Sequence, residues 1–275
     1  MKSMQQSSIQ KKTILSAKNV QKTFSNNGVQ VHVLSNVNAD IYSGDFTVIM
    51  GASGSGKSTL LYALSGMDKA TAGEVLYYRD NSEPIDITSL KEAGLAELRV
   101  KDFGFVFQQM HLVSNLTLFE NVAVTGYLDK RKSAAETKAK ADELLDRVGL
   151  KGVKNHLPAR VSGGEQQRCA IARAVINTPT LLFADEPTGA LNRNNTKEVL
   201  NLLTELNDRG QSIVMVTHDI KAALRANRLL YLEDGNIVGE LELTGYNETD
   251  ASGEKIQSDK AREAQVNAWL ESLDW

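Results

Sequence analysis

Cysteine is nearly absent from the sequence, and so is any segment typical of a targeting signal. One cysteine, Cys169, occurs among 275 residues, which excludes an internal disulfide framework. Residues 1–12 are polar and lack the apolar core of a signal peptide. We therefore expect a protein of a reducing compartment, the cytosol.

Long apolar runs are missing as well. A helix that crosses a bilayer needs about 20 consecutive apolar residues, whereas the best runs here, residues 46–50 and 213–216, contain only a handful. We expect the chain to have no membrane span of its own, although a partner protein can still hold it against a membrane.

The sequence also has no excess of charge of one sign. Lys and Arg number 31 and Asp and Glu 34, so the formal net charge is −3, spread along the chain. A duplex-binding surface needs concentrated positive charge, so nucleic acid is not an expected partner. The content of 41% hydrophobic and 24% charged residues is ordinary for a globular protein and excludes a disordered or fibrous chain.

The folded part begins with β-type segments. Residues 14–24 and 31–41 are rich in alternating apolar and polar positions, and the turn signal Asn26-Asn27-Gly28 separates them. We therefore expect the domain to open with a pair of strands.

Later apolar runs predict buried parallel strands. Residues 46–50 form such a run, followed by a Gly/Ser-rich loop and a helical pattern over residues 57–64 that Gly66 ends. Residues 181–184 and 213–217 also end in polar residues, as strands do in sheets whose ligands bind at the carboxyl ends. An α/β fold with a parallel-sheet core is predicted.

Two segments differ from this core. Residues from about 88 to 165 show helical periodicity with almost no β signal, which predicts an inserted helical subdomain. Residues 244–275 start as a polar linker and end in an amphipathic helix that we expect to pack on the domain over residues 12–243, or else to meet a partner protein. The apolar positions of that helix are Val266, Trp269, Leu270 and Leu273.

The strongest single motif is GASGSGKST, which follows the run of residues 46–50 and opens a helix. It fits G-x-x-x-x-G-K-[ST], the pattern of a phosphate-binding loop. Its backbone N–H groups and lysine suit phosphates, and its serine hydroxyl can bind Mg²⁺. The expected nucleotide-binding residues are Gly51, Ala52, Ser53, Gly54, Ser55, Gly56, Lys57, Ser58 and Thr59.

Acidic residues and a histidine follow two of the predicted parallel strands. Asp185 and Glu186 end the run that starts at Leu181, and His218 follows the run ending at Thr217. Beside a phosphate loop, Asp185 suits a magnesium ion and Glu186 an attacking water, while His218 suits the γ-phosphate. We expect Lys57, Glu186 and His218 to be the catalytic residues.

A second candidate phosphate site lies in the SGGE motif, which comprises Ser162, Gly163, Gly164 and Glu165. Adjacent glycines at a helix start leave N–H groups open to an anion. The same spacing of serine and glutamate is that of a capping box, so the motif can also serve the helix itself. A chain with one lysine-containing loop needs a reason for this second site.

The chain resembles the ATPase subunit of ABC transporters over about residues 12–243. The motifs that carry the resemblance occur in the family's order: the phosphate loop at residues 51–59, Gln108, the SGGE motif, the run ending in Glu186, and His218. The resemblance implies the P-loop NTPase (RecA-like) fold, with an antiparallel β region before the parallel core and a helical subdomain inserted in it.

This resemblance also implies ligands, partners and residue roles. ATP and Mg²⁺ are the implied ligands, with Ser58, Asp185 and Gln108 near the metal and Phe24 stacked on adenine. Two copies form a head-to-tail homodimer, in which the SGGE motif of one copy caps the ATP of the other. Gln108 also couples the dimer to a separate transmembrane permease at the cytoplasmic face of the membrane.

Within the family, Ile49-Met50-Gly51, Leu98-Arg99 and residues 117–122 look most like the branch of lipoprotein release, macrolide export and antimicrobial-peptide resistance. The resemblance thus implies export or extraction of a lipophilic or antimicrobial peptide substrate. Two positions depart from the family. Val161 stands where leucine is common, an apolar exchange that should be benign. Asn192 stands where aspartate is usual, which keeps a hydrogen-bonding oxygen but removes a charge.

Three alternative functions fit less well. ABC-type ATPases of DNA repair separate the phosphate loop from the serine motif by a very long coiled coil, which is missing between Lys57 and Ser162. Translation factors of the same family carry two such domains in one chain, and this sequence has one. A non-hydrolysing regulator is disfavoured because Glu186 and His218 are both present.

Overall fold

The computed structural model describes residues 11–26, 28–79, 82–250 and 252–275. Its larger sheet has the strand order β10-β9-β3-β8-β7-β6, in which β10 is antiparallel to β9 and the other pairs are parallel. Every residue of β3, β7 and β8 is buried, as their apolar runs require. These strands are β3 (Phe46–Met50), β6 (Phe103–Phe107), β7 (Leu181–Asp185), β8 (Ser212–Val216), β9 (Arg228–Glu233) and β10 (Asn236–Glu242).

A smaller antiparallel sheet lies beside it, with the order β2-β1-β4-β5. Its long hairpin pairs β1 and β2 from Thr13 opposite Tyr42 to Asn26 opposite Val29. Of the predicted turn, Asn27 lies outside the described residues, and Gly28 has a φ of 82°. The strands are β1 (Thr13–Asn26), β2 (Val29–Tyr42), β4 (Ala72–Tyr77) and β5 (Ile85–Asp86). The predicted α/β fold with a parallel core and an N-terminal antiparallel region is confirmed.

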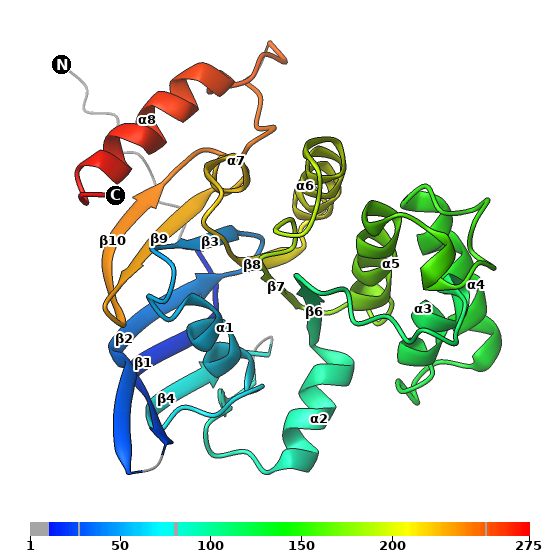
Figure 1. The fold of residues 1–275 in the computed structure, drawn as a ribbon, viewed down its shortest axis with the longest axis horizontal. Helices are drawn as coiled ribbons and strands as arrows, with labels where there is room; N and C mark the ends of the chain where they lie inside the picture. The colour runs from blue at the N-terminus through cyan, green and yellow to red at the C-terminus, as the bar shows by residue number, and fades with distance from the viewer. Residues whose placement is uncertain (1–10, 27, 80–81, 251) are drawn as a thin grey trace.

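Helix α1 (Lys57–Ser65) packs between the two sheets (Figure 1). Leu60, Leu61 and Leu64 are fully buried in an apolar core that includes Leu34 of β2 and Ile49 of β3. This packing fixes the amino end of α1 at the carboxyl end of β3, where the phosphate loop joins them.

The remaining helices flank the larger sheet, and α3, α4 and α5 gather beyond its β6 edge (Figure 1). Capping boxes start each of these three, at Thr117, Ser133 and Ser162, because serine or threonine three residues before glutamate satisfies the first free N–H groups. The elements are α2 (Glu92–Lys101), α3 (Leu118–Gly126), α4 (Ala134–Arg147), the short 3₁₀ helix η1 (Pro158–Arg160), α5 (Gly163–Val175), α6 (Arg193–Asp208) and α7 (Ile220–Ala223).

The segment of about residues 88–165, predicted to be a helical subdomain with almost no β signal, contains one strand that the prediction missed. Phe103–Phe107 forms β6, which pairs in parallel with β7 at the edge of the larger sheet. A five-residue apolar run of this kind has no periodicity that separates a strand from a buried helical turn. The helical part beyond the sheet is therefore made by α3, α4 and the start of α5.

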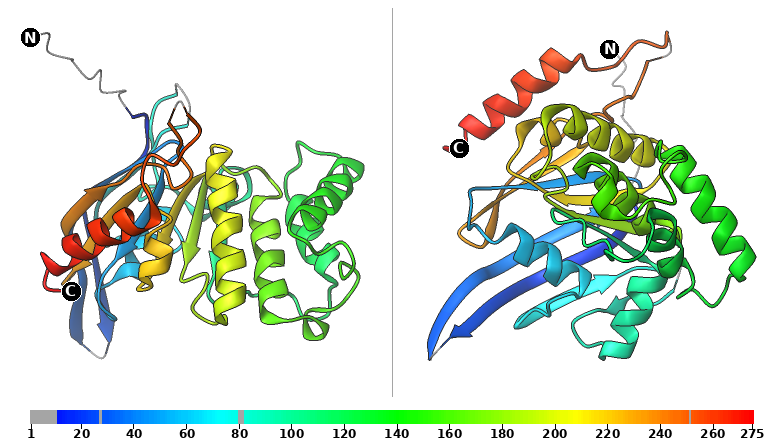
Figure 2. Two further views of the ribbon diagram at one scale, coloured as in Figure 1. Left: turned by 90° about the horizontal axis from the view of Figure 1, so that it is seen from above. Right: turned by 45° about the vertical axis from the view of Figure 1, so that its right-hand side comes forward.

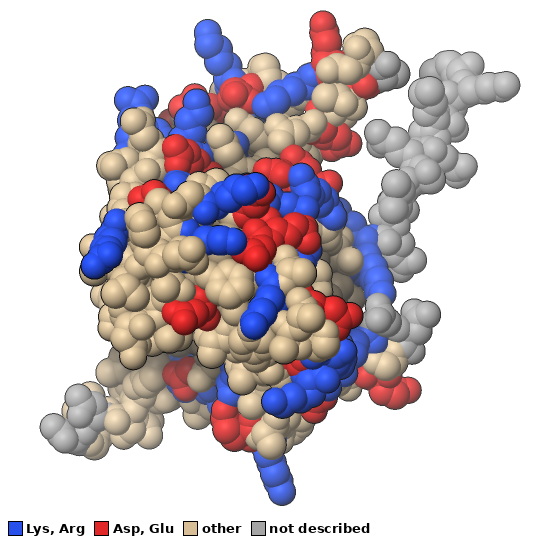
Figure 3. All heavy atoms as spheres, turned by 90° about the vertical axis from the view of Figure 1, so that its right-hand side faces the viewer, with Lys and Arg blue, Asp and Glu red and all other residues tan. Residues whose placement is uncertain are grey.

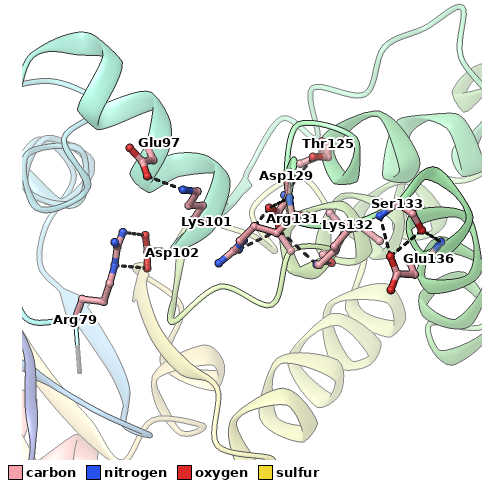
Figure 4. Close-up of polar contacts among 12 residues, drawn as sticks. Arg79, Glu97, Lys101, Asp102, Thr125, Asp129, Arg131, Lys132, Ser133 and Glu136 are labelled. Carbon is pink, nitrogen blue, oxygen red and sulfur yellow. Dashed lines mark hydrogen bonds and ion pairs between the residues drawn. The ribbon is translucent and has the colours of Figure 1, made fainter. Parts of the chain in front are cut away.

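The loop between α3 and α4 ties this helical part to the body of the protein (Figure 4). Asp129 is 1% exposed and accepts hydrogen bonds from Nε and Nη2 of Arg131, at 2.8 and 2.9 Å. Lys132 lies 3.8 Å from the same carboxylate, and its Nζ donates to the backbone oxygen of Ile176 at the end of α5. The loop is thus held by a buried charge.

Helix α8 (Asp259–Glu271) packs against β9 and β10, on the opposite side of the molecule from the helical part (Figure 2). Val266 and Leu270 are fully buried in the main core, and the ring of Trp269 meets that of Tyr231 edge to face with centroids 6.3 Å apart. Within the described ranges, no helix is both long and apolar enough to cross a membrane.

Candidate functional site

The phosphate loop adopts a conformation that requires glycine at its first fixed position. Gly51 has a φ of 150°, and a Cβ on it would lie 2.2 Å from the carbonyl oxygen of Leu232. Gly56 caps α1 in the left-handed region, with a φ of 100°. The loop therefore wraps around the amino end of α1, which concentrates N–H donors and positive dipole at one place.

A cavity of about 690 Å³ opens over this loop. It brings the loop together with Glu186 after β7, His218 after β8 and Trp275 after α8. The predicted residues from three separate motifs thus share one site at the carboxyl edge of the parallel sheet, where ligands bind in open α/β folds. The lining residues are Val33, Gly51, Ala52, Ser53, Gly54, Gly56, Lys57, Ser58, Thr59, Glu186, His218 and Trp275.

Lys57 places a buried ammonium in this cavity. It is 7% exposed, and its Nζ donates to the carbonyl oxygens of Gly51 and Ala52, at 2.9 and 2.7 Å. Burial lowers the pKa of Lys57, while the nearby carboxylates of Glu186 and Asp185 act in the opposite direction. A buried cation bonded to loop carbonyls is well placed to exchange them for phosphate oxygens.

Asp185 accepts a hydrogen bond on each of its oxygens from helix α1. Ser58 Oγ donates to Oδ1 at 2.8 Å, and the hydroxyl of Tyr62 donates to Oδ2 at 2.5 Å. Burial, followed by the contact with Asp185, raises the pKa of the Tyr62 phenol. The phenol therefore stays a proton donor at any pH at which the protein is used.

The pair formed by Ser58 and Asp185 fits a magnesium ion. Mg²⁺ prefers hard oxygen ligands and usually binds through one or two carboxylates together with substrate phosphates. In the part of the chain that the structure describes, no group of three or more His, Cys, Asp or Glu residues could hold a metal ion. A magnesium ion at this pair would take oxygens of Ser58 and Asp185, and nucleotide phosphates would complete its shell.

Glu186 and His218 form the second polar pair of the site. Glu186 Oε1 lies 3.1 Å from His218 Nδ1, with the glutamate side chain 22% exposed and the histidine 65% exposed. The backbone of Glu186 is in the left-handed region with a φ of 42°, unusual for a residue with a Cβ, and its N–H bonds to the oxygen of Val216. Strain of this kind clusters at functional sites because surrounding structure must hold it.

Gln108 reaches the same region from the end of β6. A Cβ on Gly189 would lie 2.7 Å from Gln108 Nε2 and 3.3 Å from Glu186 Oε2. Both side chains therefore lie against Gly189, and a larger residue there would displace them. The structure therefore places the side chain of Gln108 beside that of Glu186.

The SGGE motif lies elsewhere. Ser162 is the N-cap of α5, and its side chain accepts from the N–H of Glu165 in a full capping box. Ser162 and Gly163 are exposed, and no residue of the motif lines the cavity over the phosphate loop. In Figure 1, α5 stands beyond β6 and well apart from α1. Within one chain, the SGGE motif thus lies apart from the phosphate loop.

Phe24 and Asn192 also lie outside that cavity lining. Phe24 is 43% exposed on β1, with Lys22 Nζ 4.9 Å from the centre of its ring. Asn192 is the N-cap of α6, and its Oδ1 accepts from the N–H of Asn195 at 3.0 Å. Aspartate caps helices equally well, so the local fold does not explain why asparagine stands here.

Cys169 is fully buried in α5, and burial raises the pKa of its thiol to about 12. A thiol of this kind stays protonated near neutral pH and behaves as a small apolar side chain.

Sequence reasoning missed three residues of this region. Tyr62 follows Ser58 by four positions on α1, a spacing that puts both on one helix face and could have revealed it. Gln167 is fully buried, and its Nε2 donates to the backbone oxygens of Phe107 and Pro187, at 3.1 and 2.8 Å. Trp275 lies far from every motif along the chain, and no sequence signal places it at the cavity.

Comparisons with known proteins agree with this geometry. A family model described as "ABC transporter" matches residues 34–189. The macrolide export ATP-binding/permease protein MacB of Mannheimia succiniciproducens is 42% identical over 229 residues, a match that takes in 83% of this chain and 35% of that protein. This chain therefore spans about a third of the length of that curated relative.

Solved structures match over more of their own length. A dimeric bacterial ABC transporter cassette, MJ0796, is 42% identical with a TM-score of 0.77, covering 84% of this chain and 100% of that one. A dimeric post-hydrolysis state of the ATP-binding cassette MJ0796, bound to ADP and Pi, is 41% identical with a TM-score of 0.76 and the same coverage.

Proposed function

Because this chain belongs to the ABC transporter family and is an ATP-hydrolysing cassette, we propose that it is the ATPase subunit that powers a separate membrane permease. The observation that carries the proposal is the cavity in which Lys57, Glu186 and His218 meet over the phosphate loop. A site with an anion-binding loop, an acid and an imidazole at one sheet edge suits phosphoryl transfer to water.

The active form in this proposal is a head-to-tail homodimer. The SGGE motif lies well apart from the phosphate loop of its own chain (Figure 1), so in this proposal it meets the nucleotide of another copy. Two copies related by a twofold axis would each offer Ser162, Gly163 and Gly164 to the ATP held by the other. The relatives of known structure described as dimeric support this arrangement.

In this proposal, the residues predicted from the sequence each have a task in ATP binding or hydrolysis. Lys57 and the loop N–H groups bind the β and γ phosphates, and Phe24 stacks on adenine. Glu186 accepts the proton of the attacking water, and His218, 3.1 Å from it, holds the γ-phosphate end. When bound by Ser58 and Asp185 with Gln108 nearby, Mg²⁺ supplies positive charge that offsets the charge of the phosphates.

The helical part is the proposed docking face for the permease. A groove of about 710 Å³ runs along α3, and Val124, Tyr127 and Leu128 nearby are 43%, 38% and 57% exposed. Basic and acidic side chains are interspersed over this face (Figure 3), so apolar contact is the stronger candidate for recognition. The groove is lined by Leu116, Thr117, Phe119, Glu120, Ala123, Val124, Tyr127, Lys138 and Asn155.

The proposed location is the cytoplasmic face of a membrane, reached through the permease. The macrolide exporter joins ATP-binding and permease functions in one chain, of which this chain matches 35%. A separate permease would supply the corresponding remainder. We further propose that the substrate is lipophilic or an antimicrobial peptide and that it is exported or extracted.

A dimerisation experiment tests the proposal. The Glu186→Gln variant should bind ATP without hydrolysing it, because the amide cannot accept the proton of water. It should therefore run as a dimer with ATP and Mg²⁺ and as a monomer without them, in size-exclusion chromatography with light scattering.

The control is Lys57→Ala in the Glu186→Gln background, which should lose ATP binding and stay monomeric with an unchanged far-UV circular dichroism spectrum. A Glu186→Gln protein that hydrolyses ATP at the rate of the unmodified chain would contradict the assignment of Glu186. Equal ATP affinity with and without Lys57 would contradict the assignment of the loop.

A further inference from the structure

Trp275 occupies a position that the proposed mechanism does not use. It lines the cavity over the phosphate loop, and it also lines a second cavity of about 620 Å³ that contains Glu186, His218 and Asn267. These two cavities share Glu186, His218 and Trp275, so the indole stands where they join. Its side chain is still 44% exposed.

The chain geometry after α8 brings Trp275 to this place. Asp274 adopts the left-handed region with a φ of 56°, and the N–H of Trp275 bonds back to the oxygen of Leu270 at 3.3 Å. Such a turn ends a helix by reversing the chain direction. Trp275 is thus held by a helix cap whose supporting residue, Leu270, is 1% exposed.

Helix α8 also contacts the segment that follows His218 and α7. Arg262 of α8 is 2% exposed, and its guanidinium donates to the backbone oxygens of Leu224 and Ala226, which directly follow α7. Helix α7 begins at Ile220, two residues after His218. His218 and Trp275 are therefore carried by elements that the buried arginine joins, so the indole keeps its place beside the histidine.

We infer that Trp275 is a further residue of the ATP site, a positioning residue that borders the phosphate end of the nucleotide and shields the Glu186–His218 pair from bulk water. This inference rests on the proposed function. Water exclusion strengthens hydrogen bonds and charge interactions at a reacting group. The indole also becomes more covered when a nucleotide fills the cavity.

Intrinsic fluorescence tests the contact, because the chain has only two tryptophans. The Trp269→Phe variant keeps Trp275 alone, and the Trp275→Phe variant keeps Trp269, which packs against Tyr231. Adding ATP in EDTA should change the emission of the unmodified chain and of Trp269→Phe in a saturable way. The emission of Trp275→Phe should stay constant. Equilibrium dialysis measures ATP binding independently.

An activity measurement tests the shielding. Trp275→Ala should lower kcat for ATP about 3- to 10-fold while the dissociation constant of ATP changes less than about twofold, since shielding acts on the reaction and not on binding. Trp275→Phe should restore most of the rate because it restores an aromatic wall. Both variants should melt within a few degrees of the unmodified chain, since Trp275 is half exposed.

Different outcomes test the contact of Trp275 with ATP, its shielding effect and the proposed function. In one outcome, ATP binds in dialysis while the emission of the unmodified chain and of Trp269→Phe stays unchanged. That result would overturn the contact between Trp275 and ATP, and the proposed function would still hold. An unchanged kcat in Trp275→Ala would overturn the shielding. A chain that fails to bind ATP at all would overturn the proposed function and this inference with it.

Discussion

At the scale of single residues, the carboxylate of Asp185 is held on both oxygens by hydroxyls of one helix, those of Ser58 and Tyr62. Ser58, the donor to Oδ1, is itself part of the predicted metal site. Tyr62 occupies the other oxygen and so fixes the orientation of the carboxylate. It is a positioning residue, since its effect on a bound metal would pass through Asp185.

We expect Tyr62→Phe to weaken the apparent affinity for Mg²⁺ about 3- to 10-fold. This range corresponds to a net hydrogen bond of about 0.5–1.5 kcal/mol, lost when the carboxylate gains rotational freedom. The maximal ATPase rate should change less than about threefold because Glu186 and His218 are untouched. ATPase activity across a magnesium titration measures both values.

Tyr78→Phe is the matched control, because Tyr78 lies beyond the end of β4 and away from the cavity. Tyr78→Phe should reach half-maximal ATPase activity at the same Mg²⁺ concentration as the unmodified chain. The same midpoint in Tyr62→Phe and in the unmodified chain would show that Ser58 alone orients Asp185.

At the scale of elements, the α3–α4 loop depends on the buried carboxylate of Asp129. Hydrogen bonds from Arg131, the largest contribution, lower the pKa of Asp129 below its ordinary value. A lowered pKa stabilises the fold above the unfolded pKa of about 4, and this stabilisation is lost as the pH falls through the folded pKa.

Asp129→Asn should therefore lower the free energy of unfolding at pH 7 by about 1–3 kcal/mol, the usual effect of breaking buried hydrogen bonds to a charged group. Its stability should also fall less steeply than that of the unmodified chain between about pH 4 and pH 3. Urea unfolding at several pH values measures both effects. Equal acid dependence of the two proteins would show that Asp129 is not the group that titrates.

The exposed pair of Glu97 and Lys101 on α2 provides the control (Figure 4). The two side chains form an i,i+4 ion pair, in which the Glu97 side chain is 55% exposed and the Lys101 side chain 33% exposed. Exposed pairs of this kind contribute little to stability. Glu97→Gln should leave the urea midpoint at pH 7 unchanged.

Element prediction from the sequence succeeded where a local chemical rule applies. The spacing of Ser162 and Glu165 predicts a capping box at a helix start, and the observed cap of α5 at Ser162 confirms it. Strand β6 was missed because its five residues carry no distinctive period. The fixed spacing of the phosphate loop found the site. Helical spacing from Ser58 could also have indicated Tyr62, whereas Trp275 could be placed only by the structure. The roles assigned to the site residues remain predictions.

At the scale of the whole molecule, helix α3, along which the groove runs, lies far from α8, on the opposite side of the sheets (Figure 2). A permease that docks in this groove would leave the ATP cavity free to meet a second copy. We expect Val124→Asp to weaken sedimentation with native membranes at least about fivefold, because a charge in the groove would lose its hydration on docking.

Membranes from the source cells, stripped with urea and mixed with the purified chain, provide the assay. Val238→Asp on β10 changes an equally exposed valine, at 48% against 43%, outside the groove and should sediment like the unmodified chain. Equal sedimentation of all three proteins would show that the permease does not dock in the groove along α3. Equal binding to protein-free lipid vesicles would point to direct lipid contact.

The buried amide of Gln167 has a mechanical consequence for this arrangement. Its single NH₂ group bonds to the oxygens of Phe107 and Pro187, the residues next to Gln108 and Glu186. Pulling these two loops apart would strand a buried polar group at a cost of about 1–3 kcal/mol. If a permease acts on Gln108 as proposed, the hydrogen bonds of Gln167 would pass part of that displacement to Glu186.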